Sequence, residues 1–427
     1  MNVLLIGSGG RESAIAYKLS SSKSLTKLFI APGNPGTKKY GENILLNIND
    51  HNEVLSFCGK NNIKLVVIGP EKNLVEGLGD SLRKNSIRVF GPDSKAAEIE
   101  ASKTFSKSFM MQFNIPTAAY REFGLGEIEI AKEYLQAHKY PCVIKADGLA
   151  AGKGVLICNN FDDAEKALQQ IFVDKIFGES GNKLIVEEFM TGEEASVFAI
   201  TDGENFVCLP SAQDHKRIGD NDTGKNTGGM GAYSPAPVVT PEIQKETEEK
   251  IIIPALKGMN QIGRKFVGCL YCGLMISAEG VKVVEFNCRF GDPETQAVLP
   301  LLKGDFLRLL YSAAEGKLEH DTVQYSGGSA VCVIAASDGY PDQYESGFEI
   351  TGLNNAENDE IIVFHAGTKE INNKIVTVGG RVLGVTSIVE GNDLKAAKEK
   401  AYNALDKIKF EGIYYRKDIA DKALDRS

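Results

Sequence analysis

The stretch VEFNCRFGDPETQ, residues 284–296, places Glu285, Asn287 and Arg289 at every second position, with apolar residues or a cysteine between them. In a β-strand successive side chains point to opposite faces, so these three polar groups would share one face. Carboxylate and amide oxygens suit Mg²⁺, and a guanidinium suits a carboxylate or a phosphate. The stretch therefore predicts a metal and anion site. A sheet edge that faces solvent is the alternative.

The segment IGSGGRES, residues 6–13, follows an apolar strand and opens a helix. Backbone amides at Gly9 and Gly10 would meet an anion at the positive end of that helix, with Arg11 adding a charged contact. The G-x-G-x-x-G pattern of dinucleotide sites fails because Glu12 stands at the third glycine position. The segment favours a phosphate monoester over a dinucleotide, and a tight turn without a ligand is the alternative.

A second glycine-rich segment, KADGLAAGKG at 145–154, lacks the Ser or Thr that a Walker A loop uses to hold a metal. Strands are expected on both sides, so the segment is predicted to be a hairpin tip. Such a tip can fold over a triphosphate with Lys145 or Lys153 beside it. Many hairpin tips of this kind bind nothing, so the string is weak evidence alone.

The string QDHKR, residues 213–217, lies in a polar, glycine-rich segment that spans residues 211–237. Loops of this length are usually disordered or part of a site, and the absence of low-complexity repetition favours a site. No Ser or Cys nucleophile stands in a recognisable setting nearby, so a catalytic triad is not predicted. A solvated run of charges is the alternative.

Several domains must position these groups, since 427 residues are too many for one ordinary core. Up to about residue 100, apolar runs alternate with amphipathic stretches, which predicts a parallel sheet with helices on its faces. A helix is expected from a cap at Asp93 or Ser94 to about Phe113. From residue 327 the pattern indicates a small α+β domain closed by a helix near 393–408.

Composition excludes several classes of protein. A formal charge of -9 argues against a general nucleic-acid binder. No apolar run reaches the roughly 18 residues of a membrane span, and the first residues begin a strand rather than a signal peptide, so a cytoplasmic protein is expected. Cys269 and Cys272 form a C-x-x-C within an apparent strand, where they point to opposite faces, so a zinc or redox site is not expected.

Taken together, these motifs resemble those of the ATP-grasp ligases, and more narrowly the phosphoribosylamine–glycine ligase family. The resemblance is carried between residues 4 and 296 by the strings IGSGGRE, APGNPGT, VVIGPE, VIKADGLAAGKGV, EEFMTGEEAS, SAQDHKRIGDNDTGKNTGGMGAYSPAP and VEFNCRFGDPETQ. It implies a ligase that joins glycine to 5-phosphoribosylamine with ATP through a glycyl phosphate, in the second step of de novo purine biosynthesis.

The resemblance also implies a fold of mixed α/β and α+β domains. The expected parts are an N-terminal Rossmann-like parallel sheet domain at 1–100, an ATP-grasp core at 101–121 and 190–326, a mobile lid subdomain at 122–189, and a small C-terminal α+β domain at 327–427. The implied partners are the three substrates, with no nucleic acid and no membrane, and a transient contact with the preceding amidotransferase.

Roles for individual residues follow from the same resemblance. The implied metal ligands for Mg²⁺ or Mn²⁺ are Glu285 and Asn287, and the implied catalytic residues are Arg289, Asp214 and Lys145. The implied ATP-binding residues are Lys103, Lys145, Gly152, Lys153, Gly154, Glu187, Glu188, Phe189, Met190 and Glu193. The implied substrate-binding residues are Gly9, Gly10, Arg11, Pro70, Glu71, Asp214, Lys216 and Arg289. The strand CLYCGLMI contains no acid, which leaves the number of metal ions open.

Three other functions fit parts of the sequence. A different ATP-grasp ligase would release ADP on another carboxylate, such as formate, bicarbonate or D-alanine. A nucleotide-binding sensor would show no turnover. A Rossmann dehydrogenase would need the third glycine and an acid after the second strand, and both are missing.

Overall fold

The computed structural model describes residues 1–149 and 154–426. Its N-terminal part holds a five-stranded parallel sheet in the order β3-β2-β1-β4-β5, as the alternation of apolar and amphipathic stretches predicts. The inner residues of the central strand are fully buried, because helices cover both faces of the sheet. The strands are β1 (Asn2–Gly7), β2 (Lys27–Pro32), β3 (Glu42–Asn43), β4 (Ile63–Ile68) and β5 (Arg88–Phe90), and the helices are α1 (Gly10–Ser20), α2 (His51–Lys60), α3 (Glu71–Val75) and α4 (Leu78–Lys84).

The single helix expected over residues 94–113 is wrong, because the chain forms two helices, α5 (Ser94–Ala101) and α6 (Lys103–Gln112). Ser102 between them has an extended backbone, with φ of -129° and ψ of 116°, and its side chain accepts a hydrogen bond from the amide of Phe105. Serine competes for backbone donors in this way at helix starts, which the apolar periodicity does not reveal.

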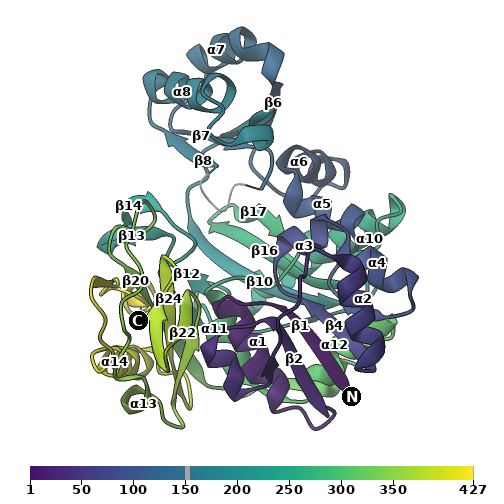
Figure 1. The fold of residues 1–427 in the computed structure, drawn as a ribbon. Helices are drawn as coiled ribbons and strands as arrows, with labels where there is room; N and C mark the ends of the chain where they lie inside the picture. Colours follow the sequence, from purple (N-terminus) through teal and green to yellow (C-terminus); the bar gives the residue numbers. More distant parts are fainter. Residues whose placement is uncertain (150–153, 427) are drawn as a thin grey trace.

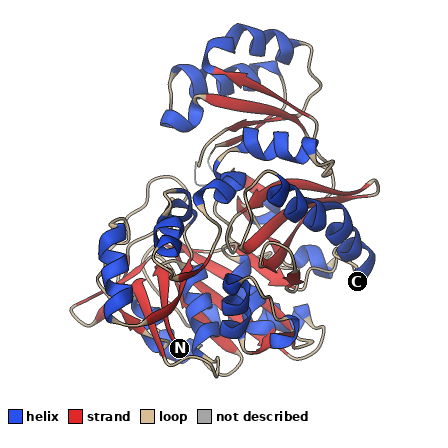
Figure 2. Ribbon diagram, turned by 90° about the vertical axis from the view of Figure 1, so that its right-hand side faces the viewer, coloured by secondary structure: helices blue, strands red, loops and turns tan. Residues whose placement is uncertain are grey.

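The lid is the lobe at the top of Figure 1, and Figure 2 shows it standing apart from the rest of the molecule in a second view. Its antiparallel sheet has the order β6-β9-β7-β8 and its own apolar core, which includes Phe123, Leu135 and Val186. β7 and β8 pair as the hairpin that the sequence predicts. The elements are β6 (Tyr120–Gly124), α7 (Ile128–Gln136), β7 (Cys142–Ala146), β8 (Val155–Cys158), α8 (Phe161–Leu168) and β9 (Lys183–Glu188).

A second antiparallel sheet, with the order β11-β10-β16-β17, lies below the lid. The register of β17 on β16 shifts so that Glu285 pairs with Gly273 and Val283 with Leu274, which leaves Val284 as a bulge. The sheet and the elements around it comprise β10 (Glu193–Thr201), β11 (Phe206–Cys208), α9 (Pro241–Thr247), α10 (Ile253–Gln261), β16 (Gly268–Ser277), β17 (Gly280–Asn287), α11 (Glu294–Val298), β18 (Leu302–Gly304), α12 (Phe306–Glu315) and β19 (Val323–Tyr325).

Cys269 and Cys272 on β16 are both buried, in two different apolar clusters. The prediction that they face opposite sides of a strand is therefore confirmed. Within the described residues, no group of three or more His, Cys, Asp and Glu side chains is arranged to hold a metal ion.

The C-terminal part is a six-stranded sheet with α14 packed on β20 and β24, so the predicted closing helix is confirmed. Two of the strands come from the polar segment 211–237, which ties this sheet to the middle of the chain, so the predicted domain boundaries stay a prediction. The elements are β12 (Gln213–Asp214), β13 (Arg217–Gly219), β14 (Thr223–Asn226), β15 (Gly231–Ser234), β20 (Ser329–Ser337), α13 (Leu353–Ala356), β21 (Ile361–His365), β22 (Thr368–Ile371), β23 (Lys374–Thr377), β24 (Arg381–Val389), α14 (Leu394–Leu405), β25 (Ile413–Tyr414) and α15 (Asp421–Leu424).

In the described part of the chain, no helix is both long enough and apolar enough to cross a membrane.

Candidate active site

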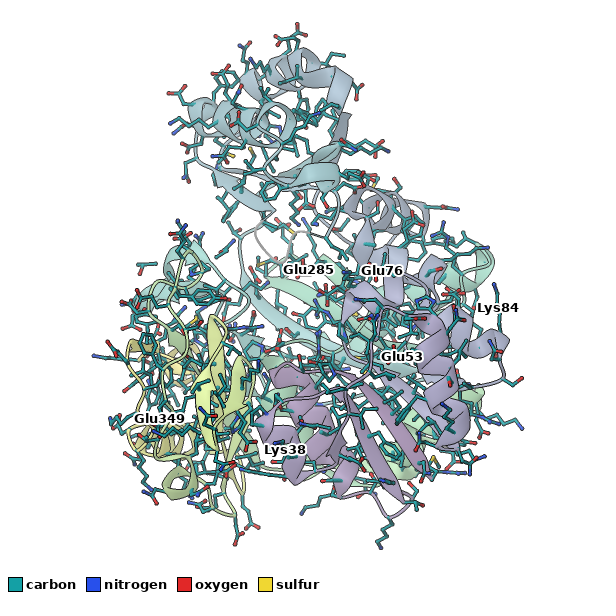
Figure 3. The ribbon with its side chains drawn as sticks, viewed as in Figure 1. Lys38, Glu53, Glu76, Lys84, Glu285 and Glu349 are labelled. Carbon is teal, nitrogen blue, oxygen red and sulfur yellow. The ribbon has the colours of Figure 1, made fainter. Side chains whose placement is uncertain are left out.

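A cavity of about 930 Å³ lies between the lid, the sheet below it and the N- and C-terminal parts. This volume is typical of small-molecule sites. Glu285, which is labelled in Figure 3, lies below the lid and lines this cavity. The predicted site residues that line it are Arg11, Glu71, Lys103, Lys145, Gly154, Glu187, Glu188, Phe189, Met190, Glu193, Asp214, Lys216, Glu285, Asn287 and Arg289.

Three of the predicted residues that the structure describes are not brought to this lining. Gly9, Gly10 and Pro70 do not line the cavity. Gly152 and Lys153 lie outside the described residues.

At one end of the cavity the buried carboxylate of Glu187 lies between two buried lysines. Its Oε2 is 2.8 Å from Lys145 Nζ, and its Oε1 is 3.2 Å from Lys107 Nζ. Burial and the neighbouring ammonium of Lys145 lower the pKa of Lys107 to about 8, against the attraction of Glu187. Two ammonium groups thus share one carboxylate, which leaves this end with an excess of positive charge.

The resemblance implied that Glu187 belongs to an adenine-binding hinge. Its side chain is instead bound to the two lysines, while the side chain of Glu188 accepts a hydrogen bond from the amide of Ala119 at 3.1 Å. Phe189 and Met190, which follow β9, line the cavity without a partner of this kind. The side chain of Glu187 therefore orients Lys107 and Lys145, and only the backbone of this residue is left for an adenine-binding hinge.

Glu285 lies in the middle of the cavity, surrounded by cations. Burial acts to raise its pKa, but Lys216, Lys145 and Lys103 outweigh burial and hold the pKa of this carboxyl below its usual value. Asn287, two residues further along β17, is also buried and lines the cavity. An ionised carboxylate and an amide oxygen on one strand face form a donor set that suits a hard divalent cation.

Arg289 lies just beyond the end of β17 and is held by two carboxylates. Its Nε is 3.2 Å from Glu71 Oε2, and its Nη2 is 2.8 Å from Glu100 Oε1. Glu100 also accepts a hydrogen bond from the amide of Cys288 at 2.7 Å, and burial raises the pKa of this carboxyl. The guanidinium is thus fixed in place and faces the cavity.

The turn after β1 differs from the predicted anion site. The amide of Gly9 donates to Glu12 Oε2 at 2.6 Å, so this donor is satisfied within the turn. The guanidinium of Arg11 contacts Glu12 at 2.8 Å, Glu71 at 3.8 Å and the carbonyl of Phe290 at 2.9 Å. Glu12, which the sequence showed only as a departure from the dinucleotide pattern, is the residue that closes this turn.

Carboxylates crowd the other side of the cavity around Lys216, which pairs with Glu194. Burial, together with the neighbouring carboxylates Glu294 and Glu194, raises the pKa of Asp214 to about 7, against the attraction of Lys216. Glu294 is buried and accepts hydrogen bonds from Tyr271 Oη at 2.9 Å and a serine hydroxyl at 3.2 Å. This side of the cavity is suited to a small cation such as an ammonium group.

Sequence reasoning missed Glu100 and Lys107, although a signal for them existed. In the single helix that the sequence predicts, Glu100, Lys103 and Lys107 would stand at i, i+3 and i+7 and share one face, although the structure divides them between α5 and α6. It also missed Arg381 on β24, which is 3.2 Å from Asp292 Oδ1 and donates to the carbonyl of Asp292 at 2.9 Å. Nothing local in the sequence links two residues so far apart.

Comparisons with known proteins agree across nearly the whole chain. Models described as the N domain, the ATP-grasp (A) domain and the C domain of phosphoribosylglycinamide synthetase match residues 1–100, 101–295 and 330–422. A protein of Mesorhizobium japonicum described as phosphoribosylamine–glycine ligase is 48% identical over 426 residues, which are 100% of this chain and 99% of that protein.

Solved structures show the same relationship. The crystal structure of phosphoribosylamine–glycine ligase from Thermotoga maritima superposes with a TM-score of 0.85 at 34% identity, covering 98% of this chain and 100% of that one. A biotin carboxylase from Campylobacter jejuni superposes with a TM-score of 0.71 at 16% identity, over 97% of this chain and 92% of that one, and shares the fold alone.

Proposed function

We propose an assignment of the cavity for this chain, which belongs to the phosphoribosylamine–glycine ligase family. The enzyme is an ATP-grasp ligase that joins glycine to 5-phosphoribosylamine, giving glycinamide ribonucleotide, ADP and phosphate. The observation that carries the assignment is the charge balance of the cavity, which has an excess of lysine at one end and of carboxylate at the other.

ATP is assigned to the lysine-rich end, with its phosphates at Lys103 and Lys145. Lys145 lies on β7 of the lid, Lys103 donates to Gly148 just after β7, and both ammonium groups act on the carboxylate of Glu285 electrostatically. The cavity continues from them along the residues after β9 to Glu193, which supports an adenine and ribose site there. The assigned ATP contacts are Lys103, Lys145, Gly154, the chain at Glu188, Phe189 and Met190, and Glu193.

Glu285 and Asn287 are assigned to Mg²⁺ or Mn²⁺. Their fit rests on the depressed pKa of Glu285, which keeps the carboxylate ionised, and on the buried amide of Asn287 two residues away. Because Mg²⁺ usually takes few protein ligands, phosphate oxygens and water would complete the shell. A bound ion would neutralise charge on the transferring phosphoryl group.

Glycine is assigned to the opposite end of the cavity. Arg289 offers a fork that matches a carboxylate, and Asp214 offers a negative charge for an ammonium group. The ammonium of Lys216 lowers the pKa of both Asp214 and Glu285, so it adds positive charge beside the reacting carboxylate.

The sugar phosphate of the amine is assigned to the N-terminal turn near Arg11, with Glu71 and Pro70 close to the ribose. Gly10 remains in this assignment, whereas the Gly9 amide would have to exchange Glu12 for a phosphate oxygen. Glu71 lies within 4 Å of both Arg11 and Arg289, so it joins this subsite to the glycine subsite.

We propose that the reaction proceeds in two steps. A carboxylate oxygen of glycine attacks the γ-phosphorus, the bond to the bridging oxygen breaks, and ADP leaves with that electron pair. The amine nitrogen then attacks the acyl carbon of glycyl phosphate, inorganic phosphate departs, and the nitrogen releases a proton. Phosphoryl transfer depends mainly on position and charge neutralisation, which agrees with the lysines and Arg289 that line the cavity.

The function is tested by measuring ADP release from purified enzyme with ATP, Mg²⁺, glycine and freshly prepared amine. We expect release to require both glycine and the amine, and to fail with formate, bicarbonate or D-alanine. Hydroxylamine in place of the amine should yield glycine hydroxamate, because it traps an acyl phosphate. Release that is equal with another carboxylate, or hydroxamate that never forms, would contradict the assignment.

We also propose that the enzyme works in the cytoplasm and makes a transient contact with the amidotransferase that forms the unstable amine. Both points rest on the family's place in purine biosynthesis. A contact would be detected as a faster coupled rate with the amidotransferase than with the same concentration of free amine.

A further inference from the structure

The N-terminus of α6 is capped from another part of the fold, by Asp147 at the end of β7. The carboxylate of Asp147 accepts the amide of Thr104 at 2.7 Å and the hydroxyl of Ser102 at 3.1 Å, both through Oδ1. Its backbone carbonyl accepts the amide of Lys103 at 3.1 Å. Two donors in the first turn of α6 are therefore satisfied by a residue that lies 43 or more positions later in the chain.

The same residue is also fastened within the lid. The amide of Asp147 donates to the carbonyl of Lys183 at 3.1 Å, and the amide of Gly148 donates to that of Ser180 at 3.3 Å. A Cβ atom at Gly148 would lie 2.3 Å from Ser180 Oγ, so only glycine fits this approach. Asp147 and Gly148 thus join the lid to the first turn of α6.

This junction sets the position of an amino group in the cavity. Lys103 is the first residue of α6, and its Nζ donates to the carbonyl of Gly148 at 3.0 Å. An ammonium group has three donors, so two remain for a ligand in the cavity that this side chain lines. The backbone and the side chain of Lys103 are therefore both held by the pair that follows β7.

Helix initiation alone does not require Asp147. Ser102 already caps α6 by accepting the amide of Phe105 at 3.1 Å. The neighbouring helix α5 begins with a local cap, in which Asp93 accepts the amide of Ala96 at 2.7 Å, and the amide of Ser94 donates to Asp80 Oδ2 at 2.9 Å. The carboxylate of Asp147 adds a second, remote cap on the residues that flank Lys103, and the backbone carbonyl of Asp147 accepts the amide of Lys103 itself.

We propose that Asp147 is a positioning residue for the phosphates of ATP, acting through Lys103. This inference rests on the proposed assignment of Lys103 to the ATP phosphates. Asp147 holds the start of α6 against the lid so that the Lys103 ammonium points into the cavity with two free donors.

The test compares Asp147→Ala with Asp93→Ala in the full-length enzyme. Each change removes one carboxylate that accepts a first-turn amide at 2.7 Å, so Asp93→Ala is a matched control for lost helix capping. We expect Asp147→Ala to raise the KM for ATP by about tenfold with little change in the KM for glycine, as for a lost charge-assisted hydrogen bond. Asp93→Ala should leave both values unchanged. Equal KM values for ATP in the two variants would overturn the proposal.

Two further variants distinguish a failure of the positioning role of Asp147 from a failure of the assignment of Lys103 to the ATP phosphates. If Lys103→Met leaves the KM for ATP unchanged, the assignment of Lys103 fails. If Lys103→Met raises it and Asp147→Ala does not, the positioning role alone fails. In the double variant, Asp147→Ala should add nothing to Lys103→Met, and an additive effect would show that Asp147 does not act through Lys103.

A conservative variant covers the case in which Asp147→Ala does not fold. Asp147→Asn keeps an oxygen that can accept the Thr104 amide but removes the charge, and we expect a KM for ATP between those of the wild type and Asp147→Ala. A KM for ATP equal to that of the wild type in every Asp147 variant that folds would overturn the proposal.

Discussion

The two ends of the cavity are built on opposite charge balances. The phosphate end contains a cluster of three lysines and one carboxylate: Lys103, Lys107, Lys145 and Glu187. The acceptor end comprises two cations and five carboxyl groups: Arg289, Lys216, Glu71, Glu100, Asp214, Glu194 and Glu294. The lysines of the first end have an excess of positive charge, which the phosphates of ATP would balance, and the carboxyl groups of the second end have an excess of negative charge, which the ammonium of glycine would balance.

The pKa shifts express the same difference. At the phosphate end, burial and a like charge lower the pKa of Lys107 to about 8. At the acceptor end, burial and like charges raise the pKa of Asp214 to about 7. In each case the site disfavours the charge of its own group, and a ligand of opposite charge relieves that cost. Glu285 lies between the ends and is influenced by cations from both.

The largest effect is expected from Glu285→Ala, which removes the charge where the two ends meet. We expect kcat to fall by about a thousandfold, because a metal ligand and the partner of several cations are lost together. The measurement is steady-state ADP release at saturating Mg²⁺. Glu279→Ala, in the exposed turn before β17, is the control and should retain full activity. Wild-type turnover in Glu285→Ala would show that the metal assignment is wrong.

Arg289→Lys is the next test, because it keeps the charge of the acceptor end and removes the fork. Lysine cannot contact Glu71, Glu100 and a substrate carboxylate in the same planar arrangement. We expect kcat/KM for glycine to fall by about a hundredfold, measured from initial rates. Arg308→Lys, at an exposed ion pair with Glu319, is the matched control. Unchanged kcat/KM in Arg289→Lys would remove Arg289 from the glycine site.

Glu187→Gln should increase the excess of positive charge at the phosphate end. Without this carboxylate, the buried ammonium groups of Lys107 and Lys145 repel each other, and stability should fall by about 3 kcal/mol. The KM for ATP should rise by about tenfold as Lys145 loses its orientation. Thermal unfolding and ATP titration measure the two effects. Glu122→Gln, at an exposed position on β6, should show neither, and an unaltered KM in Glu187→Gln would contradict the role of Glu187.

The smallest effect concerns the pH dependence of the acceptor end. Below pH about 7 the carboxyl of Asp214 is protonated and no longer attracts an ammonium group, so kcat/KM for glycine should fall as the pH drops. Asp214→Asn should lower kcat/KM by about tenfold at pH 8 and remove this dependence. A rate profile in which the acidic limb persists in Asp214→Asn would assign that limb to another group.

The same shift has a consequence for stability. The pKa of Asp214 in the folded protein lies above its value of about 4 in the unfolded chain, so between these values the folded protein keeps a proton that the unfolded chain releases. The free energy of unfolding should therefore fall as the pH rises from about 4 to about 7. Asp214→Asn should reduce that slope in chemical denaturation.

The sequence could predict the features of the cavity that depend on one strand or one hairpin. Strand alternation places Glu285 and Asn287 on one face, and the hairpin around KADGLAAGKG follows from two apolar runs about a glycine-rich turn. The partners of these residues could not be predicted, because they come from other elements. Glu100 reaches Arg289 from α5, and Glu187 reaches Lys107 across the junction between the lid and α6.

At two places the structure differs from the sequence prediction because one side chain forms a local hydrogen bond with the backbone. Ser102 interrupts an apolar pattern that otherwise reads as one helix, since its side chain caps the next turn. Glu12 takes the amide of Gly9 that the helix N-terminus would otherwise offer to an anion. In both cases one side chain satisfies a backbone donor, a choice that depends on geometry that the sequence pattern does not contain.

The most direct test is a crystal structure of the enzyme with a nonhydrolysable ATP analogue, glycine and Mg²⁺. The two-ended cavity predicts phosphate oxygens within about 3.2 Å of Lys103 Nζ and Lys145 Nζ, and glycine between Arg289 and Asp214. Phosphates bound against Arg289, or glycine bound among the lysines around Glu187, would contradict it.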